Sequence, residues 1–119
     1  MVDSIDSWIV YSGATDHVCN TLQGFKETRK FASEEFTLRL GDGSIVEARA
    51  MGDVILNFDD FRFLEIKNCY YIPVFKRNLI SVSCLMRQGY SVVFDNKVSI
   101  RKNKSLICTG THKNNLFFI

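Results

Sequence analysis

Residues 8–20 read WIVYSGATDHVCN and raise the first structural question about this chain. The apolar run Trp8-Ile9-Val10 has the residue types of a buried β-strand. It leads directly into the small-residue turn Ser12-Gly13-Ala14-Thr15. Some hydrolases hold a catalytic acid where such a strand meets such a turn. Here that position is Tyr11, so the stretch is either an active-site loop without its acid or an ordinary strand end.

The bulk composition is that of one globular domain spanning residues 1–119. A chain of this length can bury a core, and 46% hydrophobic and 24% charged residues are ordinary for a folded protein. A formal net charge of +2 gives no bulk argument for nucleic-acid binding. The apolar runs are short, and the N-terminus MVDSIDSW carries two Asp and no basic residue. We therefore expect no membrane span, no secretory signal and an intracellular protein, cytoplasmic or nuclear.

The cysteines show no paired spacing of the CxxC kind. They are Cys19, Cys69, Cys84 and Cys108. The chain is large enough to fold without disulfides, and no secretion signal accompanies the cysteines. We expect reduced and mostly buried thiols.

Alternation of apolar and polar residues predicts strands through most of the chain. Residues 36–40 place Phe36, Leu38 and Leu40 on one face, and Asp42-Gly43 is a strong signal for a hairpin turn before a return strand at 45–50. Further strands are expected at 54–58, 61–66, 69–72, 90–94, 98–100, 106–108 and 115–119.

One segment has the pattern of a helix. Ile80, Cys84 and Leu85 lie at helical spacing, and Arg87 and Gln88 precede Gly89, as at a helix C-terminus. This predicts one short helix near residues 79–88. About ten short strands and one short helix predict an all-β domain, in the form of a small barrel.

Residues 8–17 resemble the W-I-x-D-S-G-A-[ST]-x-H signature of copia-type retrotransposon Pol polyproteins, in the region of their aspartic protease. Other segments resemble motifs of the same family in the same order, so that the resemblance covers about residues 8–118. They are Leu40-Gly41-Asp42-Gly43-Ser44, the segment 64–73 ending in Tyr70-Tyr71-Ile72-Pro73, Asn78-Leu79-Ile80-Ser81-Val82 and the segment 89–94.

The resemblance implies a small closed retropepsin-like β-barrel. Two subunits of that fold build one active site, in which two carboxylates share a proton. It also implies a flap hairpin over the substrate and a helix packed beneath the active-site loop. The expected peptide groove is formed by Ala14, Thr15, Asp16, Asp42, Gly43 and Ser44. A homodimer would pair through terminal strands, here residues 3–7 and 115–119.

The chain departs from the signature at its catalytic position, where Tyr11 stands in place of Asp. A phenol has an ordinary pKa of about 10, so it is protonated at neutral pH and is a poor base. The degenerate position Tyr11, with Ser12 and Gly13, therefore predicts no aspartic protease activity. Asp16 lies five residues further on, does not match the catalytic position, and is expected to make a loop hydrogen bond.

These observations favour a pseudoenzyme, a domesticated protease-like domain that binds a protein or peptide partner or dimerises. The alternative from the enzyme class is an active-site variant of a polyprotein-processing aspartic endopeptidase. Restoring Asp at Tyr11 would then restore cleavage.

Two further classes are less favoured by the sequence. His17-x-Cys19 and Cys108-x-x-x-His112 contain zinc-binding residue types, but without the usual spacing, so no metal or other cofactor is expected. Nucleic-acid binding would use one of two basic groups, and we expect solvated faces at both instead. These groups are Lys97, Arg101, Lys102, Lys104 and Lys113, and Lys26, Arg29 and Lys30 beside Phe25 and Phe31.

Overall fold

The computed structural model describes residues 7–22, 24–32, 35–39 and 43–119. Its elements are β1 (Trp8–Tyr11), β2 (Val18–Cys19), β3 (Phe25–Lys30), β4 (Thr37–Arg39), β5 (Ile45–Glu47), β6 (Ala50–Asn57), β7 (Phe63–Tyr71), β8 (Asn78–Ser81), α1 (Val82–Arg87), β9 (Tyr90–Phe94), β10 (Lys97–Lys102), β11 (Ser105–Lys113) and β12 (Leu116–Phe118). The all-β class predicted from the sequence is confirmed. In the described residues no helix is long and apolar enough to cross a membrane.

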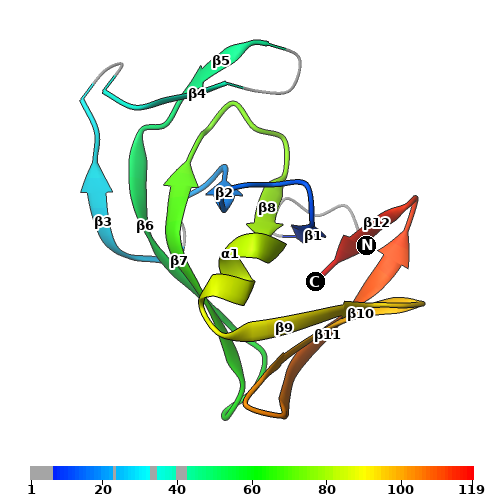
Figure 1. The fold of residues 1–119 in the computed structure, drawn as a ribbon. Coiled ribbons are helices and arrows are strands. Elements are labelled where there is room, and N and C mark those ends of the chain that lie inside the picture. Colours follow the sequence, from blue (N-terminus) through cyan, green and yellow to red (C-terminus); the bar gives the residue numbers. More distant parts are fainter. Residues whose placement is uncertain (1–6, 23, 33–34, 40–42) are drawn as a thin grey trace.

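Ten of the strands form one strongly curved sheet, in the order β3-β6-β7-β2-β8-β1-β12-β11-β10-β9. Figure 1 shows β3, β6 and β7 on one side of the molecule and β9 to β11 on the other, with α1 between them. The centre of the sheet holds β1, which pairs in parallel with β8 and antiparallel with β12. Strand β1 therefore lies in the middle of the sheet.

Both halves of the sheet contribute to one main core. Val54 and Leu64 come from the β6–β7 side, Leu85 from α1, and Val98 and Ile100 from β10. These five residues are almost completely buried. Burying apolar side chains from segments this far apart in sequence folds the sheet around α1.

A smaller core supports the β4–β5 hairpin, which forms its own two-stranded sheet. Its buried residues Val18, Ala48 and Ile72 pack against aromatic side chains. The ring of Phe36 stacks on Tyr70 with centroids 4.6 Å apart. This contact attaches the hairpin that the resemblance assigns to a flap. Asp42, predicted for its turn, lies outside the described residues.

The helix is shorter than the sequence predicted. Residues 78–81 form strand β8, and α1 begins at Val82 and ends at Arg87, followed by Gly89 at φ +96°. The prediction was wrong for residues 79–81 because these residues pair with β1. A strand neighbour supplied by tertiary structure overrides helical spacing in so short a segment.

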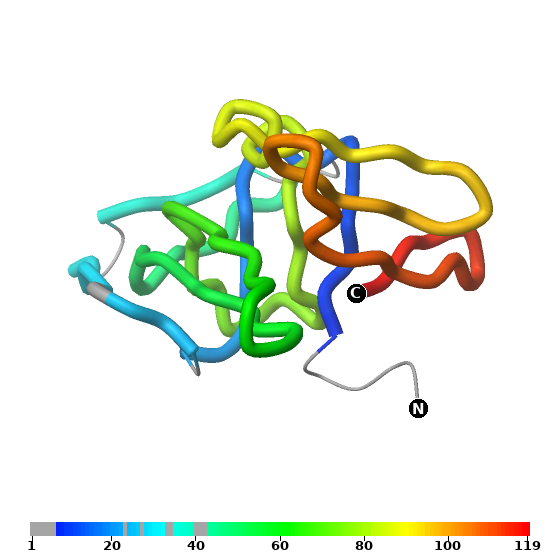
Figure 2. Tube along the Cα trace, turned by 90° about the horizontal axis from the view of Figure 1, so that it is seen from below, coloured from blue at the N-terminus to red at the C-terminus, as the bar shows by residue number. Residues whose placement is uncertain are grey.

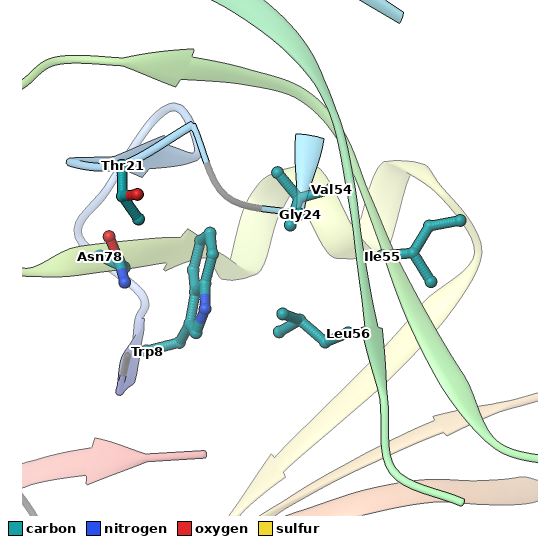
Figure 3. A pocket seen from close by; sticks show the side chains of 7 residues that line it. All are labelled: Trp8, Thr21, Gly24, Val54, Ile55, Leu56 and Asn78. Carbon is teal, nitrogen blue, oxygen red and sulfur yellow. The ribbon is translucent and has the colours of Figure 1, made fainter. Parts of the chain in front are cut away.

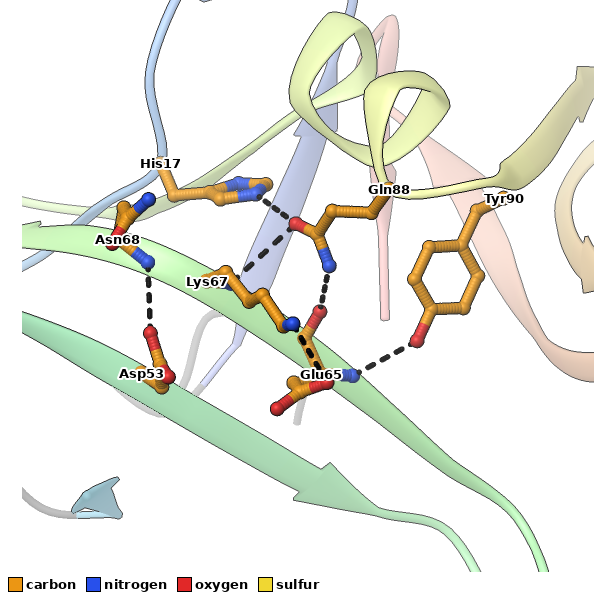
Figure 4. A network of polar contacts seen from close by, with 7 residues as sticks. All are labelled: His17, Asp53, Glu65, Lys67, Asn68, Gln88 and Tyr90. Carbon is orange, nitrogen blue, oxygen red and sulfur yellow. Dashed lines mark hydrogen bonds and ion pairs between the residues drawn. The ribbon is translucent and has the colours of Figure 1, made fainter. Parts of the chain in front are cut away.

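The expected closed barrel is wrong for the described strands, because β3 and β9 stand at opposite ends of the hydrogen-bonded order. The junction of α1 and β9 meets β7 through side chains instead (Figure 4). The Gln88 amide donates to the carbonyl of Glu65 (2.8 Å), and the Glu65 N–H donates to the Tyr90 hydroxyl (3.2 Å). These two side chains satisfy backbone groups that a neighbouring strand would otherwise pair, so a backbone ladder does not close the sheet there.

The C-terminal strand returns to its own sheet. Two Asn residues with positive φ, Asn114 and Asn115, form the turn before β12. β12 then lies between β1 and β11, with Ile119 N donating to the Trp8 carbonyl (2.9 Å). Figure 2 shows the C-terminus beside the start of β1. Because β12 has a strand on each side, it offers no free edge for pairing with a second copy.

Candidate functional site

Tyr11 is the last residue of β1, and it lies beside Ser81 in the parallel pairing with β8. The three residues before it are buried, whereas Tyr11 itself is 47% exposed. The rigid centre of the sheet thus ends at a side chain that projects to the surface. Ser12 and Gly13, the other two residues of the degenerate motif, are also exposed.

The phenol ring of Tyr11 lies back over Gly13. A Cβ added at Gly13 would stand 2.7 Å from the Tyr11 Cζ atom and 2.8 Å from its hydroxyl oxygen. Such distances are shorter than van der Waals contact. Glycine at this position therefore makes room for the ring, which would have to turn away from any larger residue.

The inner side of the loop is held by Ser81, which is fully buried. Its hydroxyl donates to the carbonyl of Ala14 (2.8 Å) and accepts from the backbone N–H of Cys84 (3.2 Å), so that Ser81 is also the N-cap of α1. The Cys84 thiol donates to the Thr15 carbonyl (3.3 Å). The start of the helix is thereby fixed to the loop, in agreement with the helix expected beneath it.

His17 completes this inner network. Its Nδ1 accepts the backbone N–H of Ser81 (3.0 Å), so the neutral ring carries its proton on Nε2. Nε2 lies 3.4 Å from the Gln88 side-chain oxygen and is placed to donate to it (Figure 4). Gln88 therefore connects the loop after β1 to the contact with β7.

Burial lowers the pKa of His17 from 6.5 to about 4, although the hydrogen bond to Gln88 and the charge of Asp16 act in the opposite direction. The imidazole is neutral at physiological pH. A neutral ring whose two nitrogens are both used cannot also act as a base at the surface.

Two hollows open on either side of Tyr11. One, of about 320 Å³, is lined by Tyr11, Gly13, Ala14, Thr15, Asp16, Val18, Leu38, Arg39, Phe75 and Leu79. The other, of about 210 Å³, is lined by Val10, Tyr11, Ser12, Phe94, Asn115, Leu116 and Phe117. The phenol belongs to both, and the lining of the second is mostly apolar.

The residues predicted for a peptide groove are brought together only in part. Ala14, Thr15 and Asp16 line the larger hollow. Gly43 and Ser44 are exposed but line neither hollow, and the contribution from the hairpin comes from β4. Asp16 accepts a hydrogen bond from the Thr15 hydroxyl (3.0 Å), as expected for a loop carboxylate.

The zinc hypothesis finds no support in the described residues, in which no group of three potential ligands surrounds one point. Cys108 and His112 lie on the same strand, where four residues span about 13 Å. Neither nitrogen of His17 is available to a metal. All four cysteines are free thiols, and burial raises the pKa of the Cys108 thiol to about 11.

A further hollow lies at the other end of β1 (Figure 3). It measures about 190 Å³ and is lined by Trp8, Thr21, Gly24, Val54, Ile55, Leu56 and Asn78. Trp8 is nearly buried, and Asn78 accepts the backbone N–H of Asn20 (3.0 Å). This hollow shares no lining residue with the two beside Tyr11.

Sequence reasoning missed the residues that hold the loop. The sequence identified His17 and Ser81 only as members of family motifs, and Gln88 only as a residue near a helix C-terminus. It assigned none of them a role in holding the loop. For Ser81 the signal is a polar residue between the buried apolar residues Ile80 and Val82, since buried polar groups need partners. The partners themselves are 64 and 71 residues apart in sequence.

Residues 8–90 match the family described as "Pol polyprotein, beta-barrel domain". The chain is also 27% identical over 111 residues to the retrovirus-related Pol polyprotein from transposon TNT 1-94 of Nicotiana tabacum. That alignment covers 92% of this chain but 8% of the relative, so the chain spans less than a tenth of the relative's length. No solved structure matches the chain.

Proposed function

Because the chain belongs to the family of Pol polyprotein β-barrel domains, we propose that it is an aspartic-protease-like domain that lacks catalysis and binds an extended protein segment beside Tyr11. The proposal joins this family to the resemblance of residues 8–17 to a copia-type protease signature. One observation carries it: the end of β1 presents an exposed phenol where that signature has a carboxylate.

The loss of catalysis follows from the chemistry of this position. An aspartic protease needs one carboxylate to take a proton from water and a second to protonate the scissile carbonyl. A phenol is protonated at neutral pH and activates no water. The nearby Asp16 lies five residues after Tyr11 in the same loop and accepts a hydrogen bond from the Thr15 hydroxyl.

The binding role rests on the surroundings of Tyr11. Tyrosine has a large apolar ring and a polar hydroxyl, and it is enriched in protein interfaces. An extended segment lying across the ring could place one side chain in each hollow. The loop beneath is held by Ser81 and His17, so little conformational freedom would be lost on binding.

The test is a selection of peptides from a random library on the immobilised chain, followed by affinity measurements with two matched variants. Tyr11→Ala removes the proposed anchor, whereas Phe61→Ala removes an aromatic ring that is 89% exposed on the β6–β7 hairpin. We expect Tyr11→Ala to weaken the selected peptides by about tenfold or more and Phe61→Ala to leave them unchanged. Equal losses of affinity in the two variants would contradict the proposal, and so would a selection that yields no peptide.

The enzyme alternative is tested on the same chain by Tyr11→Asp. Cleavage of peptides at mildly acidic pH by this variant alone would mean that the scaffold is a protease inactivated at one position. Its oligomeric state should be measured in parallel, because the expected active site needs two subunits. A dimer would have to form without the edge of β12, which is already paired on both sides.

A further inference from the structure

The C-terminal part of this chain carries an excess of positive over negative charge. Residues 96–119 contain five basic residues and no acidic residue, namely Lys97, Arg101, Lys102, Lys104 and Lys113. The net charge of the whole chain is only +2, so the preceding residues are net negative. The basic segment forms β10, β11 and β12, and β9 to β11 make up one side of the molecule (Figures 1 and 2).

The register places most of these cations on one face. On β10, Val98 and Ile100 are buried in the main core, so Lys97, Ser99 and Arg101 point outward. On β11, Thr111 lies beside Lys97 and Thr109 beside Ser99, and Lys113 continues the same face. We call Lys97, Ser99, Arg101, Thr109, Thr111 and Lys113 the basic face.

Lys102 does not belong to this face. Its ammonium lies 4.7 Å from the ring centroid of the buried Tyr90, on the core side of β10. The outward cations instead follow a line along the hairpin, since same-face residues are about 6.6 Å apart on a strand. Lys113, Lys97 and Arg101 therefore span about 20 Å, with hydroxyl groups between them.

Carboxylates do not neutralise this face. Among the residues that the structure describes, none of the ion pairs involves the basic face, whereas Arg29, Arg49 and Arg62 each have a carboxylate partner. The nearest acid in sequence is Asp95, and its Oδ1 accepts the backbone N–H of Lys97 (3.0 Å). A solvated surface on which positive and negative side chains are mixed would not show this separation of charge.

The turn beside the basic face adds a second observation. Lys104 follows Asn103 at the tip of the β10–β11 hairpin and has φ +69°. This is the left-handed region, which glycine occupies without strain and lysine does not. Lys104 is therefore a fourth cation at the end of the line, at a position where the backbone conformation favours glycine.

We propose that the basic face binds the phosphate backbone of a nucleic-acid strand without reading its sequence. The four cations Lys97, Arg101, Lys104 and Lys113 would contact phosphates, and the Ser and Thr hydroxyls would donate to phosphate oxygens. The outward residues include no aromatic ring on which a base could stack, so no sequence preference is expected. The sequence alone favoured a solvated face here; the register and the lack of ion pairs on this face among the described residues lead to this different conclusion. The proposal does not rest on the peptide-binding role of Tyr11.

The test measures binding of the purified chain to a fluorescein-labelled oligouridylate by anisotropy, across salt concentrations. With up to four phosphate contacts, log K should fall with log salt at a slope of about −3. The double variant Lys97→Gln with Arg101→Gln should weaken binding by about tenfold or more at low salt. The matched control Lys26→Gln with Lys30→Gln removes the same charge from strand β3 and should change binding by less than about twofold.

Thermal unfolding of each variant shows whether it is folded, and Lys104→Gln with Lys113→Gln replaces the first pair if it is not. The proposal is supported if the unmodified chain binds the oligonucleotide in a salt-dependent way and only the basic-face variant loses affinity. Equal loss in the β3 control would mean that bulk charge alone is responsible and would overturn it. It is also overturned if the chain binds no oligonucleotide at low salt, or binds only vesicles containing phosphatidylserine.

Discussion

The inner and outer sides of the loop at residues 11–17 differ in how their polar atoms are used. On the inner side, the Ser81 hydroxyl, the His17 ring and the Gln88 amide are bonded to protein partners. On the outer side, Tyr11, Ser12 and Gly13 face solvent and two hollows. The inner side of the loop is thus held by hydrogen bonds while its outer end is exposed, as the proposed binding surface requires.

Among the substitutions around this loop, the largest effect is expected from Ser81→Ala. The change leaves the partly buried Ala14 carbonyl without its donor and removes the N-cap of α1. The free energy of unfolding should fall by about 3 to 4 kcal/mol, measured by urea denaturation. Ser83→Ala is the control, because the Ser83 hydroxyl lies 3.1 Å from that of Ser81 but does not cap the helix. Equal losses in the two variants would show that Ser81 does not hold the loop.

The next effect is a pH dependence from His17, whose pKa is lowered to about 4 in the folded chain. Between pH 6.5 and 4 the unfolded chain binds a proton that the folded chain excludes, so stability falls as pH falls. Stability is unaffected above the unfolded pKa, and the loss reaches about 3 kcal/mol below the folded one.

Urea denaturation at several pH values measures this loss. His17→Asn, whose side-chain oxygen can still accept from Ser81, should lose most of the dependence. The matched variant His112→Asn alters a histidine that stacks on Phe117 and should retain it. A pH dependence of stability that persists in His17→Asn would have to come from the carboxylates.

A smaller effect is expected where the inner side reaches β7. Gln88→Ala removes the donor to the Glu65 carbonyl and the partner of His17, which should cost about 1 to 2 kcal/mol. Tyr90→Phe removes only the acceptor for the Glu65 N–H and should cost about 1 kcal/mol. Amide hydrogen exchange at Glu65 checks the cause, because the N–H should lose protection in Tyr90→Phe. Unchanged protection there would mean that the Tyr90 hydroxyl does not hold this amide.

The smallest effect is expected on the outer side. Tyr11→Ala should change the free energy of unfolding by no more than about 0.5 kcal/mol, because the ring is half exposed and lies back over Gly13 at the surface. Trp8→Ala, at the buried end of the same strand, should cost about 3 to 5 kcal/mol. Both values come from thermal or urea unfolding. A large loss for Tyr11→Ala would mean that the phenol is part of the core.

The fold could be predicted in its class and in most strands, because alternation and turn residues are local. The errors are informative. Residues 79–81 were assigned to the helix, although β1 holds them as a strand, and strand β3 at Phe25–Lys30 was not predicted because its charged residues lack an apolar face. The closed barrel is not formed because the end strands β3 and β9 do not pair with each other in the described residues.

Neighbouring residues alone indicate that Tyr11 follows a buried strand and precedes a small-residue turn, and they show the order of the family motifs. The sequence does not show that His17, Ser81 and Gln88 support that turn. Nor does it show that cations of β10 and β11 share one face, which forms no ion pair in the described residues. The reason is physical: hydrogen-bond partners and charge surroundings are set by strand register and packing, which join residues far apart in the chain.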